Sequence, residues 1–85
     1  MSQPLSRAES LRKRLDEIDS SIASRENENH LLTTAMDGRN ATPAGKLGIF
    51  TERNEADSSA IMRNNEALNI LRNQKAILEN QLETL

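Results

Sequence analysis

The stretch LRKRLDEIDSSI, residues 11–22, decides the fold of this 85-residue chain. Its apolar residues are Leu11, Leu15, Ile18 and Ile22, which follow one another at intervals of four, three and four. Such intervals place every apolar side chain on one narrow stripe of an α-helix, as in a coiled coil. The stretch therefore predicts a long amphipathic helix that packs against another helix.

This first helix is predicted over about residues 4–36. Pro4 suits the first helical position, where its missing N–H costs nothing. Ser6 followed by Glu9 matches a capping box, in which each side chain accepts a hydrogen bond from the backbone of the other. Gly38 follows the last periodic residues and predicts the helix end, because glycine readily adopts the left-handed conformation that closes a helix.

A connection is expected over about residues 37–50, which hold all three glycines. The second helix is then expected over about residues 51–85, beginning at Thr51. A start near residue 43 is the alternative, because Thr42 followed by Pro43 matches an N-cap with proline at the first helical position. The two glycines that follow Pro43 disfavour that start, since each costs a helix interior about 1 kcal/mol relative to alanine. Both starts remain open at this point.

The second helix carries one apolar stripe and the beginning of a second. Ile70 and Ile77 lie off the main stripe and seven residues apart, which is typical of a helix with more than one neighbour. We therefore expect an all-α fold in which residues 1–85 form one antiparallel helical hairpin. Self-association into a four-helix bundle or a larger homo-oligomer is expected through Ile70 and Ile77, with a dimer as the simplest case. The main stripe consists of Ile61, Leu68, Leu71, Leu78, Leu82 and Leu85.

The composition excludes several classes of protein. Only 35% of the residues are hydrophobic, Phe50 is the single aromatic residue, and valine and cysteine are absent. The lack of valine and of other aromatics argues against a β-sheet. The lack of cysteine excludes disulfides, thiolate zinc sites and cysteine nucleophiles. The single histidine, His30, cannot form an imidazole metal cluster, so we expect no metal, no cofactor and no enzymatic activity.

The charge balance disfavours a nucleic-acid partner. Eleven basic and thirteen acidic residues give a net charge of −2, whereas nucleic-acid binders usually present a basic surface. In outline only, the predicted hairpin resembles the ROP-type RNA-binding dimer of plasmid copy-number control, and that resemblance implies nucleic-acid binding as a minor alternative. The sequence has no apolar run long enough for a membrane span and no secretory pattern at residues 1–4, so we expect a cytoplasmic protein without a membrane partner.

Polar residues interrupt both apolar stripes. Because a buried arginine needs a partner, we expect Arg25 to meet Asp57, within the chain or across an oligomer interface. Such a polar layer either fixes the register of the helices, as asparagines do in coiled coils, or forms a cavity for a small anionic ligand such as a nucleotide. The polar residues of the stripes are Arg25 and Asn29 in the first helix and Asn54, Asp57 and Asn64 in the second.

The connection is the candidate surface for a different protein. It combines positive charge, mobile backbone and apolar side chains, and aromatic and arginine anchors concentrate binding energy at interfaces. Ile49 and Phe50 either close the end of the helix bundle or form a docking knob. The candidate partner-binding residues are Arg39, Lys46, Leu47, Ile49 and Phe50.

Together these features predict a small non-enzymatic protein-interaction module that acts as a homo-oligomer through its helix faces and its turn. An adaptor, regulator or inhibitor of bacterial or phage origin fits this description. A helical bundle that sequesters a small anionic ligand is the alternative, and a ROP-like nucleic-acid binder is the second alternative.

Overall fold

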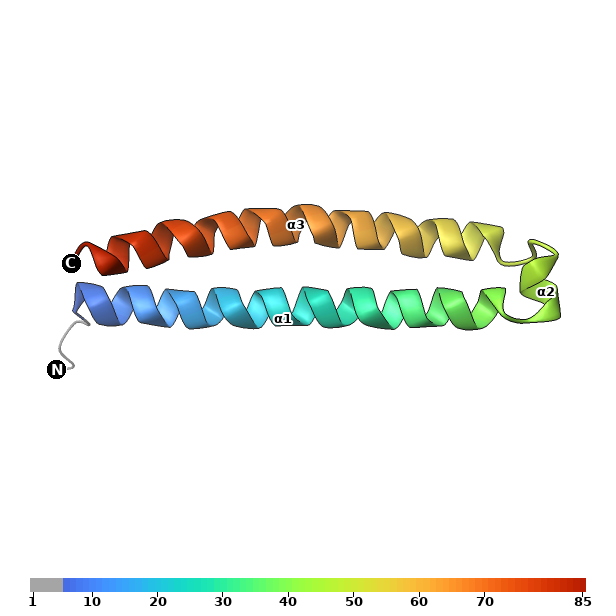
Figure 1. The fold of residues 1–85 in the computed structure, drawn as a ribbon, viewed down its shortest axis with the longest axis horizontal. Helices are drawn as coiled ribbons and strands as arrows, with labels where there is room; N and C mark the ends of the chain where they lie inside the picture. Colours follow the sequence, from blue (N-terminus) through green and yellow to red (C-terminus); the bar gives the residue numbers. More distant parts are fainter. Residues whose placement is uncertain (1–5) are drawn as a thin grey trace, which may run out of the picture.

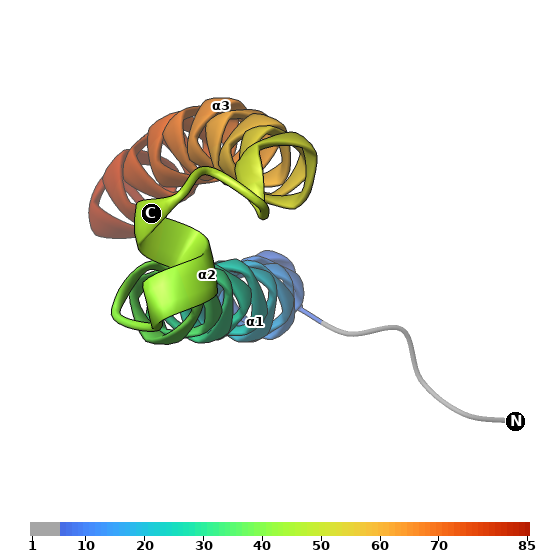
Figure 2. The same cartoon turned by 90° about the vertical axis from the view of Figure 1, so that its right-hand side faces the viewer.

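The computed structural model describes residues 6–85, which form three helices. Helices α1 (Arg7–Asn40) and α3 (Thr51–Glu83) lie side by side and run in opposite directions, and the short α2 (Pro43–Lys46) bridges their ends (Figures 1 and 2). The molecule measures 62 × 26 × 15 Å. The described residues contain no strand, which confirms the all-helical prediction.

Helix α1 begins where the sequence predicts its cap. Ser6 is the N-cap residue, and its hydroxyl accepts a hydrogen bond from the backbone N–H of Glu9 at 3.1 Å. This bond satisfies one of the backbone donors that the first turn of a helix leaves free. The predicted role of Pro4 lies outside the described residues.

The predicted end of the first helix near residue 36 is wrong, because α1 continues through Gly38 to Asn40. Gly38 does not adopt the left-handed conformation, since Gly48 is the described glycine with a positive φ. The extra turn brings Arg39 and Asn40 against α3, where both make side-chain hydrogen bonds. These tertiary contacts outweigh the weak local preference of one glycine.

The two starts predicted for the second helix correspond to two separate helices, α2 after Thr42 and α3 at Thr51. Thr42 caps α2 by accepting a hydrogen bond from the N–H of Gly45 at 3.0 Å, with Pro43 in the first turn. Gly48 then turns the chain with φ 79°, a conformation that favours glycine. The firm helix α3 starts at Thr51, whose hydroxyl donates to the carbonyl oxygen of Gly48 at 2.7 Å.

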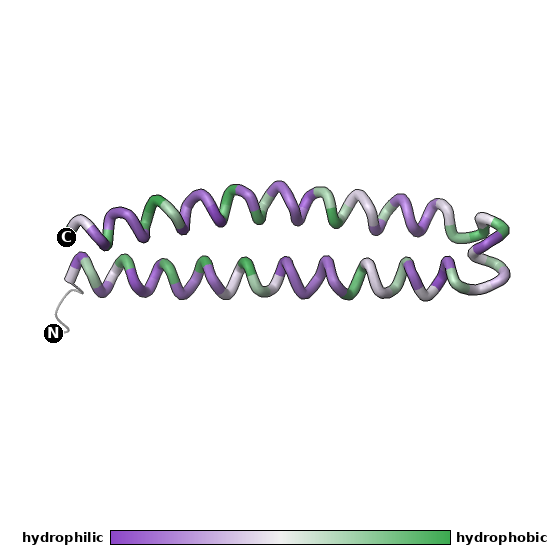
Figure 3. Tube along the Cα trace, in the orientation of Figure 1, coloured by the Kyte–Doolittle hydropathy of each residue, from purple (hydrophilic) through white to green (hydrophobic). Residues whose placement is uncertain are grey.

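The interface between α1 and α3 is narrow and partly polar. Hydrophobic residues recur along both helices at the spacing of a coiled coil (Figure 3). Leu11, Ile18 and Leu68 are the buried apolar residues, while Asp57 and Asn64 are buried polar ones. The protein therefore places polar groups at the same depth as its core leucines and isoleucine.

Substitution of Gly45 by alanine is expected to destabilise the protein by about 1–3 kcal/mol. An added Cβ would lie 1.9 Å from the carbonyl oxygen of Arg39, so α2 would have to move away from the end of α1. The free energy of unfolding from urea titration followed by circular dichroism measures the effect.

Gly38→Ala is the matched control. A Cβ at Gly38 meets nothing within 4 Å, and alanine is the better helix former by up to about 1 kcal/mol. We expect Gly38→Ala to raise the free energy of unfolding. Equal effects of the two substitutions would contradict the close approach of α2 to α1.

Candidate functional site

Four polar side chains form a layer near the middle of the helix pair, here called the middle polar layer. Arg25 Nη1 donates to Asn64 Oδ1 at 2.9 Å, and Asn64 Nδ2 donates to Asn29 Oδ1 at 2.9 Å. Asn29 Nδ2 in turn donates to Asn65 Oδ1 at 3.0 Å. Asn64 lies at the centre of this chain of hydrogen bonds and is only 4% exposed.

A second group, the apical polar layer, lies where α1 ends and α3 begins. Arg39 Nη2 forms an ion pair with Asp57 Oδ2, and Arg39 Nε donates to Asn54 Oδ1 at 3.1 Å. Asn54 Nδ2 donates to Asn40 Oδ1 at 2.7 Å. Arg53 Nε lies 3.8 Å from Asp57 Oδ1, the other carboxylate oxygen. Asp57 is buried, with 7% of its surface exposed.

The expected pairing of Arg25 with Asp57 is wrong within the chain. Because α1 extends four residues beyond its predicted end, Arg39 reaches the level of Asp57, and Arg25 lies opposite Asn64 instead. Arg39 follows Arg25 by fourteen residues and therefore lies on the same stripe of α1. This spacing places Arg39 among the polar residues of the stripe, but the helix end predicted near residue 36 left Arg39 outside the helix.

Within residues 6–85, every buried side-chain nitrogen and oxygen has a hydrogen-bond partner. The buried polar atoms of both layers therefore have partners within the chain. This arrangement favours the register interpretation of the polar residues over a ligand cavity, because a shifted register would separate these partners.

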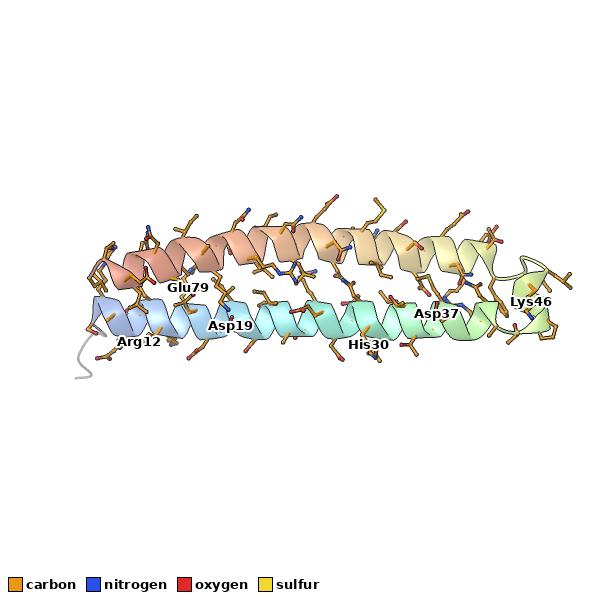
Figure 4. All side chains as sticks on the ribbon, in the orientation of Figure 1. Arg12, Asp19, His30, Asp37, Lys46 and Glu79 are labelled. Carbon is orange, nitrogen blue, oxygen red and sulfur yellow. The ribbon has the colours of Figure 1, made fainter. Side chains whose placement is uncertain are left out.

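The apex of the molecule presents the exposed residues Lys46, Leu47 and Ile49, here called the apex patch. Leu47 is 81% exposed and Ile49 is 66% exposed, so Ile49 does not close the end of the helix pair. Lys46 lies at this end in Figure 4. Phe50 is half-buried at the start of α3. Arg39 does not belong to this surface, because its side chain turns into the apical polar layer.

One side of the helix pair, the bridged flank, is crossed by charged and polar contacts. Lys75 Nζ lies 2.8 Å from Asp19 Oδ1, and Asp19 is labelled on α1 in Figure 4. Arg72 Nη2 lies 3.9 Å from Glu26 Oε2. The Asn29–Asn65 hydrogen bond lies on the same side, so polar groups close this flank from Asp19 to Asn29 of α1.

The hydrogen bond to Asp19, followed by the attraction of its charge, raises the pKa of Lys75 above its ordinary value of 10.5. A raised pKa means that, while Asp19 carries its negative charge, the pair stabilises the fold below pH 10.5, and that this contribution is lost as the pH rises through the raised pKa. We expect Asp19→Asn to lower the pKa of Lys75 toward 10.5, as measured by NMR titration of its side chain. An unchanged pKa in the variant would contradict the Asp19–Lys75 pair.

The opposite side, the open flank, carries the predicted oligomer residues. Ile70 and Ile77 are each 58% exposed on α3. Three adjoining hollows lie along this side, and neighbouring hollows share lining residues. One of them is lined by α1 alone, and the other two are lined by both helices. The open flank is defined by eight residues, which are Arg14, Ser21, Ser24 and Glu28 of α1 and Ala67, Ile70, Gln74 and Ile77 of α3. The same hollows are also lined by Ser20, Arg25, Leu71 and Leu78.

Two further properties concern the described part of the chain. No group of three or more His, Asp or Glu residues in it could hold a metal ion, and His30 is exposed on α1 (Figure 4). None of its helices is both long enough and apolar enough to cross a membrane.

No protein family, curated protein or solved structure matches this chain.

Proposed function

We propose that this protein is a non-enzymatic interaction module, which acts as a homo-oligomer through its helix faces and offers the apex patch to a different protein. One observation carries the proposal. Among the described residues, three apolar side chains are buried, whereas seven large apolar side chains are exposed. The exposed set consists of Leu31, Leu47, Ile49, Met62, Ile70, Ile77 and Leu85.

The shape of the molecule supports the same proposal. Its radius of gyration is 19.1 Å, whereas a compact domain of this length has about 12 Å. Its accessible surface is 6396 Å², whereas a compact protein of 9.5 kDa exposes about 5,000 Å². The excess is larger than the roughly 800 Å² that each partner buries in a standard interface. A second molecule can therefore cover a large area without any change of fold.

The charges of a hollow on the bridged flank disfavour capture of a small anion there. Arg12 and Lys75 line a hollow on the bridged flank, but Asp16, Asp19 and Glu79 line the same hollow. Three carboxylates against two cations give this hollow a negative balance, which repels a phosphate or a nucleotide. We therefore favour a protein partner over the anionic ligand that the sequence left open.

Thermal unfolding at increasing protein concentration tests the proposal. If association stabilises the folded chain, its melting temperature must rise with concentration, since mass action favours the associated state. We expect such a rise from low to high micromolar concentration. A melting temperature that is independent of concentration would contradict the homo-oligomer.

A further inference from the structure

The two flanks of the helix pair differ in a way that selects one of them for a partner. Ion pairs and hydrogen bonds join α1 to α3 across the bridged flank. Arg25 lines two hollows of the open flank and donates a hydrogen bond to Asn64 of α3. Within residues 6–85, the eight residues that define this flank form no ion pair or side-chain hydrogen bond between α1 and α3. The bridged flank is therefore closed by contacts between charged and polar side chains at its surface, whereas the outer side chains of the open flank are left without a partner on the other helix.

The open flank is suited to a helix because it combines two exposed isoleucines with several small side chains. Ile70 and Ile77 protrude on α3, while Ser21 and Ser24 of α1 and the half-buried Ala67 lie between or beside them. Small side chains let a second helix approach closely, since the distance between packed helices depends on the side chains at their contact. Protruding isoleucines beside small residues give the knobs and hollows that such packing needs.

The charges of the open flank are complementary to themselves. Arg14, Ser21 and Glu28 follow one another at intervals of seven residues, so they lie on one stripe of α1. Arg14 and Glu28 therefore lie on either side of Ser21, each about 10 Å away along the helix. A twofold axis perpendicular to α1 at Ser21 would place Arg14 of one copy against Glu28 of the other.

The same axis also matches the isoleucines. The midpoint between Ile70 and Ile77 falls beside Gln74, and Gln74 lines the same hollow as Ser21. The midpoints on the two helices are thus at the same level. One rotation therefore pairs Arg14 with Glu28 on α1 and Ile70 with Ile77 on α3.

We propose that a second copy of this chain docks on the open flank in antiparallel orientation, about a twofold axis that lies in the interface and runs across it from Ser21 of α1 to Gln74 of α3. This assignment rests on the proposed homo-oligomer and names its interface. A twofold interface uses the same patch on both copies, which is what a self-complementary pattern of charge and shape provides. The product is a four-helix bundle whose two apex patches lie at opposite ends.

Cysteine cross-linking tests which flank is used. The chain has no cysteine of its own. A disulfide between two copies of a single-cysteine variant therefore shows that the substituted position of one copy lies next to the same position of the other. In Ser21→Cys, the thiols of the two copies meet at the axis, and we expect mild oxidation to give a covalent dimer. Ala23→Cys is the matched control, because Ala23 is exposed at nearly the same level of α1 but two residues around the helix. Cross-linking of the control as efficiently as Ser21→Cys would overturn the proposal.

Charge reversal tests the antiparallel register. In Arg14→Glu and in Glu28→Arg, like charges face each other twice in the dimer, so we expect the dissociation constant to rise at least about tenfold. The double variant Arg14→Glu/Glu28→Arg restores both pairs and is expected to return to the wild-type dissociation constant. Circular dichroism verifies that all three variants remain helical. A double variant that stays as weak as the single variants would overturn the proposed register.

The outcomes separate this proposal from the proposed function. If the wild-type chain associates but neither the cross-link at Ser21 nor the charge rescue is observed, the open flank is not the interface and the homo-oligomer stands. If the wild-type chain is a monomer at all concentrations tested, both proposals fail.

Discussion

Leu68→Ala is expected to lower the free energy of unfolding by about 3 kcal/mol, the typical cost of truncating a buried leucine. Leu68 is the most buried apolar residue of the described chain, with 3% of its surface exposed. The loss combines the transfer free energy of the removed carbons with the cost of the cavity left behind. Urea titration followed by circular dichroism at fixed protein concentration measures it.

The expected loss is a large fraction of the total free energy of unfolding of a small domain. Small domains are stable by roughly 5–15 kcal/mol in total, and this chain buries few apolar side chains. Met62→Ala is the matched control, because Met62 lies on the same helix and is 65% exposed. We expect the control to change the free energy of unfolding by less than about 0.5 kcal/mol. Similar losses in the two variants would show that α3 does not pack on α1 through Leu68.

Arg39→Met is expected to lower the free energy of unfolding by about 2–3 kcal/mol, somewhat less than the cost of breaking a fully buried ion pair. The substitution keeps the bulk of the side chain but removes the cation that faces Asp57. The carboxylate of Asp57 would then remain buried with Arg53 as its remaining cation, whose Nε lies 3.8 Å from Asp57 Oδ1 and whose side chain is largely exposed. Asn54 would also lose its hydrogen bond from Arg39.

A double variant separates the ion pair from simple packing. Arg39→Met/Asp57→Leu replaces both charges by apolar side chains, and such a replacement is often neutral or stabilising. We expect the double variant to regain most of the stability that Arg39→Met loses. If its loss equals the sum of the two single losses, the contribution of the apical polar layer does not come from the Arg39–Asp57 pair.

The helical architecture follows directly from the spacing of apolar residues. The intervals within residues 11–22 require a helix with one buried stripe, and the structure buries Leu11 and Ile18 from that stretch. The caps at Ser6 and Thr42 were equally readable, because both are local hydrogen bonds between residues three apart. Local interactions leave a local signal in the sequence.

The register of the polar residues could not be predicted from the sequence in the same way. It depends on where α1 ends, and the end at Asn40 is set by contacts of Arg39 and Asn40 with α3, which begins eleven residues later. Asn65 joins the middle polar layer although it lies one residue off the main stripe, because Asn29 faces it across the bridged flank. Neither partner could be inferred from one helix alone.

Light scattering coupled to size-exclusion chromatography tests the central claim most directly, because it gives the mass of the particle independently of its elongated shape. The account predicts that the wild-type chain elutes at micromolar concentration with twice the monomer mass of 9.5 kDa. A mass of 9.5 kDa at every concentration up to the solubility limit would contradict it.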